Sequence, residues 1–269
     1  MNFTARLRGI EALAAMFDRA KEESRAAFLP YFPVGYPTYD ASLDAIQAMA
    51  EAGVDGFEIG VPFSDPLADG PTIQAATQVA LENGITVGKC LDAVRVLRGR
   101  GVMQPMLLMS YLNPLLAYGL ERFAAGARAA GADGVIVPDL PPEEAGAWSE
   151  ICRDAGLATV FFLAPTSDSR RIELVNRHVT GFIYVVSLTG VTGARADLPP
   201  DLTDFIARVR ALADKPLVLG FGISTPEQAR TMNGLVDGFI VGSALVKAGK
   251  DGASAVGTLA ARLREAVNV

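Results

Sequence analysis

Short apolar runs recur along this chain, and longer amphipathic stretches lie between many of them. The runs cover residues 28–34, 56–60, 105–110, 133–137, 158–163, 181–187, 216–220 and 237–241. The helix-like stretches cover 42–52, 120–130, 143–155, 201–212 and 226–232. Strands that alternate with helices pair in parallel through right-handed crossovers. The runs are apolar throughout, as expected of strands that are covered on both faces. The pattern therefore predicts an α/β fold with a parallel sheet.

Eight such units in 269 residues favour a closed (β/α)8 TIM barrel over an open sheet. No linker or low-complexity segment divides the chain, so residues 1–269 are expected to form one domain. An amphipathic segment at 7–19 precedes the first strand and is predicted to be an extra helix that closes the barrel floor. The interval between the second and third strands is the longest, which predicts an additional helix there.

A weak internal repeat supports the barrel. The segments EAGVDGFEIG at 51–60, AAGADGVIVPD at 129–139 and GLVDGFIVGS at 234–243 share a small-residue turn, Asp-Gly and an apolar strand. Asp and Gly at the end of a helix are typical of turns. We therefore expect structural roles for Asp55, Asp133 and Asp237 at the bottom of the barrel.

His178 is the one histidine of the chain. Zinc sites with two histidines, the iron site of two histidines and a carboxylate, and histidine-rich copper sites are therefore excluded. Cys90 and Cys152 lie far apart in helix-like stretches, which predicts two buried, reduced thiols. We expect no metal site, and acid–base chemistry must come from carboxylates, tyrosines or the backbone.

The charge balance excludes another class of function. The chain has 24 Lys and Arg against 30 Asp and Glu, and no basic run argues for binding to nucleic acid. The N-terminus has no apolar signal segment, and no apolar run approaches the roughly 18 residues that span a bilayer. We therefore expect a cytoplasmic protein that contacts neither nucleic acid nor membrane.

Glu58 lies inside the second apolar run. With a period of two residues, Glu58 and Gly60 share one face of the strand, and Phe57 and Ile59 share the other. The bulky pair belongs against the helices, so Glu58 should point into the barrel. A structural glutamate paired with a buried cation is the alternative, but no strand run supplies Arg or Lys. Burial of an unpaired carboxylate raises its pKa, which makes Glu58 a candidate catalytic residue.

The loop after the same run carries Asp65 and Asp69. Barrel active sites lie at the C-terminal ends of the strands, so this loop is a candidate site. Asp-Pro and Asp-Gly are also turn formers, and Gly70-Pro71 is typical of a helix start. Each aspartate therefore has either a structural role or, together with Glu58, a role in general acid–base catalysis.

Small residues follow three consecutive strands near the end of the chain: Gly190–Gly193, Gly220–Ser224 and Gly242–Ser243. Barrels of this type often bind phosphate with the loops after strands seven and eight and a helix N-terminus. These glycines predict a phosphate site, with 190–193 as a lid over it. Ordinary turns that require glycine are the alternative.

Several alternative chemistries fail for lack of residues. A Schiff-base aldolase needs a lysine that faces the barrel interior, but Lys89 and Lys247 lie in helix-like stretches and Lys215 precedes a strand. His178 stands at a predicted helix end, which favours a surface role. Tyr184 and Tyr111 are either substrate contacts or core aromatics.

At this point the motifs resemble a known family. EIGVPFSDPLADGP at 58–71 resembles the signature of the tryptophan synthase alpha subunit family. Six further stretches stand in the order of that family: YFPVGYPT at 31–38, LLMSYLNP at 107–114, VPDLPPEE at 137–144, SLTGVTGAR at 187–195, GFGIS at 220–224 and VGSALV at 241–246. Leu188 stands where some members have arginine, and Phe57 stands where an aliphatic residue is usual.

The resemblance implies a metal-free retro-aldol cleavage of indole-3-glycerol phosphate to indole and glyceraldehyde 3-phosphate, with no cofactor in this subunit. By motif position, Glu58 exchanges protons at indole C3 and at the side-chain hydroxyl. Asp69 accepts from the indole N–H and stabilises the cation that forms.

The resemblance also implies the binding residues. The phosphate ligands are Gly193, Gly222, Gly242 and Ser243. Thr192 orders the lid over Asp69. Tyr184 and Phe221 lie at substrate-pocket positions, and Tyr31, Met109 and Phe162 are expected to line the indole site.

The family further implies a partner, a beta subunit that carries pyridoxal phosphate, in an alpha2beta2 heterotetramer. By the same resemblance the partner interface includes Asp65, Pro66, Tyr111 and Asn113. Two other functions are weighed against this one. The first is a related phosphate-binding barrel isomerase or synthase, and the second is a non-catalytic barrel that activates a partner enzyme.

Overall fold

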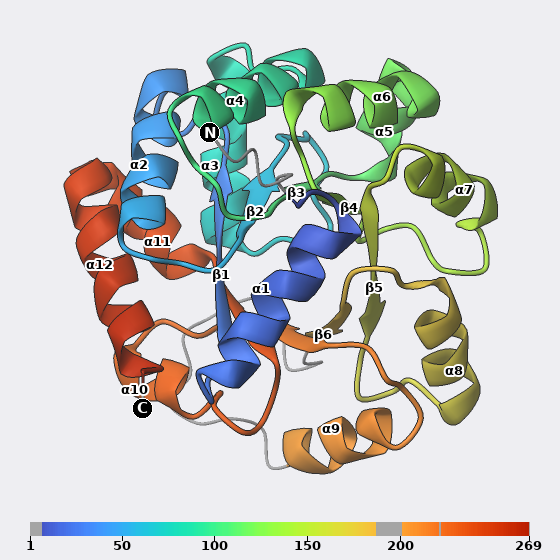
Figure 1. The fold of residues 1–269 in the computed structure, drawn as a ribbon. Helices are drawn as coiled ribbons and strands as arrows, with labels where there is room; N and C mark the ends of the chain where they lie inside the picture. Colours follow the sequence, from blue (N-terminus) through green and yellow to red (C-terminus); the bar gives the residue numbers. More distant parts are fainter. Residues whose placement is uncertain (1–6, 187–200, 221, 269) are drawn as a thin grey trace, which may run out of the picture.

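Eight parallel strands close into a barrel in chain order, with β1 paired to β8 (Figure 1). The computed structural model describes residues 7–186, 201–220 and 222–268. The strands are β1 Ala27–Pro33, β2 Phe57–Gly60, β3 Met106–Met109, β4 Gly134–Ile136, β5 Ala158–Leu163, β6 Ile183–Val186, β7 Leu217–Gly220 and β8 Gly238–Val241. Each predicted run forms a strand, and each strand starts within two residues of the predicted start. The prediction of a TIM barrel is confirmed.

Helices surround the barrel. They are α1 Ile10–Glu22, α2 Tyr39–Glu51, α3 Pro71–Glu82, α4 Val87–Gly99, α5 Leu112–Tyr118, α6 Leu120–Ala130, α7 Gly146–Asp154, α8 Ser169–His178, α9 Leu202–Arg210, α10 Pro226–Arg230, α11 Ser243–Ala248 and α12 Ala253–Ala266, with a 3-10 turn at Gly249–Asp251. The interval between β2 and β3 holds two helices, α3 and α4, so the predicted insertion is confirmed. Among the described helices, none is long and apolar enough to cross a bilayer.

The sequence pattern did not predict α5. Asn113-Pro114 reads as a turn, but Pro114 is the third residue of this helix. The first four N–H groups of a helix have no partner inside it, so a proline there removes no helical hydrogen bond.

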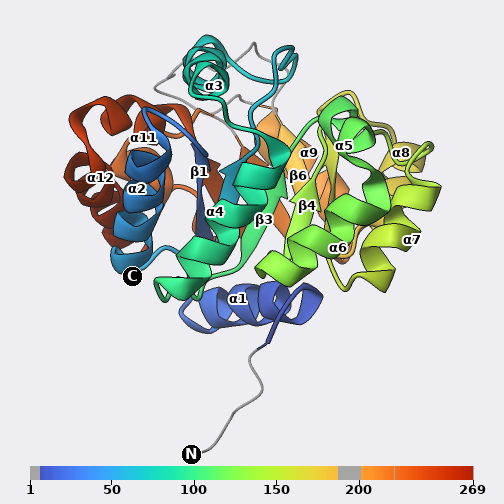
Figure 2. The same cartoon turned by 90° about the horizontal axis from the view of Figure 1, so that it is seen from above.

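The predicted extra helix α1 covers one end of the barrel, whereas α3 lies beside the opposite end (Figure 2). Met16 and Phe17 of α1 are buried, and the Phe17 ring meets the Phe182 ring edge-on at 6.0 Å. The backbone N–H of Gly9 donates to the Asp133 carboxylate at 2.9 Å. The helix therefore closes the floor, and in the part of the chain that the structure describes the open end of the barrel is the one beside α3.

The three aspartates of the repeat have the structural role that was predicted. Each aspartate lies just before one strand and accepts a hydrogen bond from a backbone N–H of the strand before that one. The donor is the first residue of its strand for Asp133 and Asp237 and the second residue for Asp55. The bonds are Phe28 N–H to Asp55 at 2.8 Å, Met106 N–H to Asp133 at 2.9 Å and Leu217 N–H to Asp237 at 2.7 Å. Each aspartate also pairs with an arginine, in the pairs Arg25–Asp55, Arg98–Asp133 and Arg210–Asp237. These contacts join neighbouring strands at the floor, far from the open end.

Candidate active site

Glu58 lies in the middle of β2, opposite Tyr31 of β1 and Leu107 of β3. Its neighbours Phe57 and Ile59 are fully buried against the helices, and Glu58 itself is only 3% exposed. Among the described residues, no Arg or Lys forms an ion pair with Glu58. Burial and the nearby charge of Asp69 together raise the pKa of Glu58 to about 8. The glutamate is therefore largely protonated at neutral pH.

Asp69 lies in the loop between β2 and α3, half-buried at the open end of the barrel. Its backbone is fixed on both sides, because its N–H donates to the Pro66 carbonyl at 3.0 Å and its carbonyl accepts from the Gln74 amide at 2.9 Å. Burial raises the pKa of Asp69 to about 6, although a hydrogen bond with Tyr111 opposes the shift. At neutral pH Asp69 is thus ionised beside a protonated Glu58.

Tyr111 holds this loop in place. Its hydroxyl accepts a hydrogen bond from the backbone N–H of Ala68 at 3.0 Å, and its ring packs on Phe63 with the centroids 5.3 Å apart. The side chain is 3% exposed. Tyr111 thus supports the loop of Asp69 from within this chain, and its expected place at the partner interface stays a prediction. Asp65 and Asn113, from the same prediction, are exposed, and Pro66 is half-buried.

Two tyrosines fill spaces that two glycines leave open. Tyr31 lies opposite Glu58, and its hydroxyl is 2.4 Å from where a Cβ of Gly60 would stand. The hydroxyl of Tyr184 is likewise 2.4 Å from the Cβ position of Gly220. The charges of Glu58 and Asp69 raise the pKa of both tyrosines beyond the effect of burial. Both hydroxyls therefore lie inside the barrel near the two carboxylates.

The other predicted pocket residues lie around these tyrosines. Phe162 of β5 stacks on Tyr184 with the ring centroids 4.6 Å apart. Met109 of β3 lies opposite Gly60 in the strand register and is 7% exposed. The structure thus brings Tyr31, Met109, Phe162 and Tyr184 to one apolar mouth around Glu58.

The predicted phosphate residues lie at neighbouring strand ends. β7 and β8 are adjacent, with Gly220 opposite Ile240. Gly222 follows β7 with φ at +45°, a backbone conformation that favours glycine. Gly242 precedes α11, and Ser243 is its first residue. The backbone N–H groups of these turns have the small-residue surroundings that an anion needs. Thr192, Gly193 and Phe221, and also Leu188, lie outside the described residues.

Sequence reasoning missed Gln74 and Thr77 of α3. Gln74 holds the carbonyl of Asp69, and Thr77 is 4% exposed. A signal for Thr77 exists, because it is the one polar residue on the buried face formed by Ile73, Ala76 and Ala80.

The remaining polar candidates lie away from the mouth. His178 is the last residue of α8, and its ring meets Phe161 edge-on. Cys90 and Cys152 are buried free thiols, as predicted. Lys89 and Lys247 lie on helices and Lys215 precedes β7. These three lysines thus lie where the sequence predicted.

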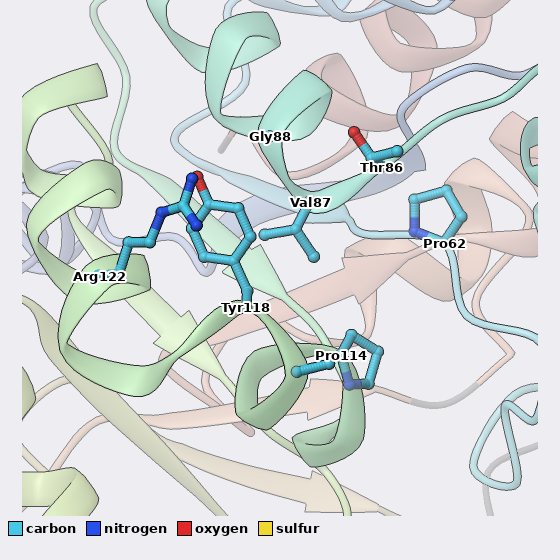
Figure 3. A pocket seen from close by; sticks show the side chains of 8 residues that line it. Pro62, Thr86, Val87, Gly88, Pro114, Tyr118 and Arg122 are labelled. Atoms are coloured by element: carbon cyan, nitrogen blue, oxygen red, sulfur yellow. The ribbon is translucent and has the colours of Figure 1, made fainter.

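An open depression of about 480 Å³ lies outside the barrel mouth (Figure 3). Pro62, the start of α4, and residues of α5 and α6 line it. Arg122 lies over the Tyr118 ring at 4.5 Å on one side of this depression. Neither Glu58 nor Asp69 lines it, so it is separate from the site described above.

Comparison with known proteins places this chain in a family. Residues 17–268 match the family model described as tryptophan synthase alpha chain. The tryptophan synthase alpha chain of Chloroflexus aggregans is 51% identical over 230 residues, which is 86% of each chain. That of Geobacter sulfurreducens is 46% identical over 260 residues, 95% of this chain and 98% of the relative.

Solved structures of tryptophan synthases superpose on this chain as well. A structure of Mycobacterium tuberculosis tryptophan synthase superposes with a TM-score of 0.90 at 39% identity, covering 96% of this chain and 98% of that one. The tryptophan synthase alpha chain of Legionella pneumophila superposes with a TM-score of 0.87 at 34% identity, covering 95% and 97%. The match extends over nearly the whole chain at identities that indicate common descent. The chain belongs to the tryptophan synthase alpha chain family.

Proposed function

We propose that Glu58 and Asp69 carry out the reaction of the family at the open end of this barrel. That reaction is the cleavage of indole-3-glycerol phosphate to indole and glyceraldehyde 3-phosphate, so the chain is a carbon–carbon lyase of tryptophan biosynthesis. The observation that carries the residue assignment is the buried Glu58, whose raised pKa keeps it protonated beside an ionised Asp69.

Glu58 moves the protons of the reaction. Protonated Glu58 gives its proton to C3 of the indole ring, which converts the ring to an indolenine cation. The bond between C3 and the glycerol chain then breaks, and its electron pair restores the aromatic ring. The hydroxyl proton of the glycerol carbon returns to the Glu58 carboxylate as the aldehyde forms, so the glutamate ends the cycle protonated. A carboxyl group with a pKa near the working pH suits both transfers.

Asp69 stabilises the charge that appears on the ring. An ionised carboxylate that accepts the indole N–H lowers the energy of the cation formed after protonation at C3. The loop contacts with Pro66, Gln74 and Tyr111 fix this carboxylate before substrate arrives. Fixed charge is effective because no reorganisation is needed during the reaction.

The rest of the substrate is assigned to the surrounding residues. We assign the phosphate to Gly222, Gly242 and Ser243 together with Gly193. The indole ring is assigned to Tyr31, Met109, Phe162, Tyr184 and Phe221, and Thr192 to the loop that closes over Asp69. Backbone amides are neutral donors, so an acidic chain can hold an anionic substrate without a basic patch.

The family also provides the assembly. The alpha chain has no cofactor of its own, and pyridoxal phosphate belongs to the beta subunit, with which it forms an alpha2beta2 complex. We propose that the exposed Asp65 and Asn113, with Pro66, contact that partner, and that residues 1–269 form one domain working in the cytoplasm.

An assay of indole release from indole-3-glycerol phosphate, with and without a beta subunit, tests the function. The Glu58→Gln variant should bind substrate but release indole about 1,000-fold more slowly, because general acid–base groups contribute on that order. Glu82→Gln on the exposed face of α3 is the matched control and should keep full activity.

Near-normal turnover of Glu58→Gln would remove Glu58 from the mechanism. If the wild-type chain released no indole in either assay, yet activated a beta subunit, the non-catalytic interpretation would hold instead. Conversion of the substrate without free indole would favour a related isomerase.

A further inference from the structure

Four aromatic side chains form a row that runs from the floor of the barrel to its mouth. The ring of Phe17, on α1, meets the ring of Phe182 edge-on with the centroids 6.0 Å apart. The ring of Phe182 in turn lies 6.3 Å from that of Tyr184, and Tyr184 stacks on Phe162 at 4.6 Å. Phe182 lies two residues before Tyr184, so both side chains point to the same side of β6, into the barrel. The row therefore connects the N-terminal helix with the pocket position of Tyr184.

The lower end of this row is tightly packed. Phe182 is completely buried, and Phe17 is 8% exposed. The Cε1 atom of Phe17 lies 3.3 Å from where a Cβ of Gly238 would stand, at the first residue of β8. The Phe17 ring is thus packed between the start of β6 and the start of β8, where it supports Phe182 from below.

The start of α1 is docked by a contact that requires glycine. Gly9 has φ at +65°, and a Cβ at this position would stand 2.0 Å from the carbonyl oxygen of Gly156. The Gly9 N–H donates to the Asp133 carboxylate at 2.9 Å. The position of α1, and with it that of Phe17, is therefore set by the floor of the barrel.

The upper end of the row is the Tyr184 ring. It lies over Gly220, whose Cβ position is 2.2 Å from Cε1 of the tyrosine. Phe162 stacks on one face of the ring, and Phe182 lies on the side of the floor. Protein interiors are close-packed, and neighbours relax into the space that a truncated side chain leaves. Truncation of Phe182 or Phe17 should therefore let the Tyr184 ring move toward the floor.

We propose that Phe17 and Phe182 are positioning residues, which hold the Tyr184 ring at the height in the barrel where it contacts the substrate. This rests on the proposed assignment of Tyr184 to indole-3-glycerol phosphate. The helix α1 thus supports the substrate site through two rings, in addition to covering the floor.

The test compares Phe17→Leu, Phe182→Leu and the double variant with the wild type in the indole-release assay. Each single change should raise KM about two- to tenfold, the contribution of one aromatic pair. The value of kcat should stay within about twofold, because none of the four rings moves a proton in the proposed mechanism. Since both rings act through the same row, the double variant should have a KM no higher than that of the worse single variant.

Two further variants separate positioning from a loss of stability. Met16→Ala truncates another buried residue of α1, whose sulfur lies 2.8 Å from the Cβ position of Gly56, outside the row. It should lower stability at least as much as Phe17→Leu but leave KM at the wild-type value. Gly9→Ala keeps all four rings but displaces the start of α1, so it should raise KM as Phe17→Leu does.

The Tyr184→Leu background tests the route of the effect. If Phe17 acts through Tyr184, adding Phe17→Leu to Tyr184→Leu should raise KM no further, because the ring that it positions is already gone. Urea unfolding shows that each variant is folded under the assay conditions. Should Phe17→Leu fail to fold, Phe17→Met, which keeps more of the side-chain volume, takes its place.

A wild-type KM in either Phe17→Leu or Phe182→Leu would overturn the proposal. An equal rise of KM in Met16→Ala would also overturn it, and so would a further rise in the Tyr184→Leu background. A wild-type KM in Tyr184→Leu itself would instead overturn the assignment of Tyr184 to the substrate, on which the proposal rests.

Discussion

Asp69 lies close enough to Glu58 that its negative charge adds to burial in raising the pKa of that glutamate to about 8. The pKa of Asp69 itself is raised to about 6. Between these two values the pair holds one proton, and it lies on Glu58. This is the protonation state that the proposed mechanism requires.

The dependence of kcat/KM on pH should therefore be bell-shaped. Activity should fall below about pH 6 as Asp69 is protonated and above about pH 8 as Glu58 ionises. The two limbs belong to the coupled pair. Steady-state indole release over this range measures them, and an Asp69→Asn variant should lose the acid limb. A flat profile would contradict the assignment.

Stability should depend on pH through the same glutamate. The pKa of Glu58 is about 8 in the folded chain against 4.5 for an unperturbed glutamate. A raised pKa gives stability that is fully present below about pH 4.5 and lost as pH rises through about 8. Glu58→Gln does not titrate, so at about pH 9 it should be more stable than wild type by about 2–5 kcal/mol.

Urea unfolding at about pH 4.5 and about pH 9 measures this difference, using the linear dependence of free energy on denaturant. The gain should nearly vanish at the lower pH, where Glu58 is neutral in the folded chain and about half protonated in the unfolded chain. Glu82→Gln, on the surface, should show no gain at either pH. An equal gain at both would show that the buried charge is not its source.

Gly220→Ala should displace Tyr184. The added methyl group would stand 2.2 Å from Cε1 and 2.4 Å from the hydroxyl of Tyr184. Overpacking of this kind costs about 1–3 kcal/mol, and the displaced ring should raise KM for the substrate. Gly99→Ala is the control, because no atom lies within 4 Å of its Cβ position at the end of α4.

Thermal unfolding and steady-state kinetics measure both variants. Gly99→Ala should be neutral or slightly stabilising, since alanine favours the helix over glycine. If Gly220→Ala kept the wild-type stability and KM, Tyr184 would have to be free to move out of the mouth.

The floor of the barrel should depend on Asp55. Both of its oxygens accept from Arg25, at 2.6 and 2.8 Å, and one also accepts the Phe28 N–H. Asp55 and Arg25 are 1% and 6% exposed. Asp55→Ala removes the buried acidic partner of the Arg25 guanidinium, which then keeps one acidic partner, the exposed Glu23, and should lower the free energy of unfolding by about 3–5 kcal/mol.

Asp92→Ala removes the exposed ion pair with Arg95 and should change stability by less than about 1 kcal/mol. Urea unfolding at neutral pH compares the two variants. Equal effects would mean that the contacts of Asp55 do not support the barrel.

Much of the fold of this protein could be predicted from local patterns in its sequence. Nearly continuous apolar runs predicted all eight strands, because a strand covered on both faces has few polar positions. The repeated Asp-Gly turns predicted floor contacts, and the period of two residues in β2 predicted that Glu58 points inward. The motif at 58–71 predicted the family through the order of its residues alone.

Other features of the site could not be predicted from the sequence, because they arise from contacts between segments that are far apart in the chain. Spacing alone left Asp69 between a turn and a catalytic role, and the contacts with Tyr111 and Gln74 show how its loop is held at the mouth. The Tyr111 hydroxyl accepts a hydrogen bond from the Ala68 N–H, a contact that no local pattern predicted. The packing of Tyr31 on Gly60 joins two separate strands and has no local pattern.

The sequence by itself therefore determined the barrel, its floor and the inward carboxylate, since these follow from the spacing of apolar and polar residues along single strands. Only the tertiary structure decided which hydroxyls surround that carboxylate and how the loop of Asp69 is anchored. Burial, and hence the pKa of each group, is set by neighbours that the fold brings from elsewhere in the chain.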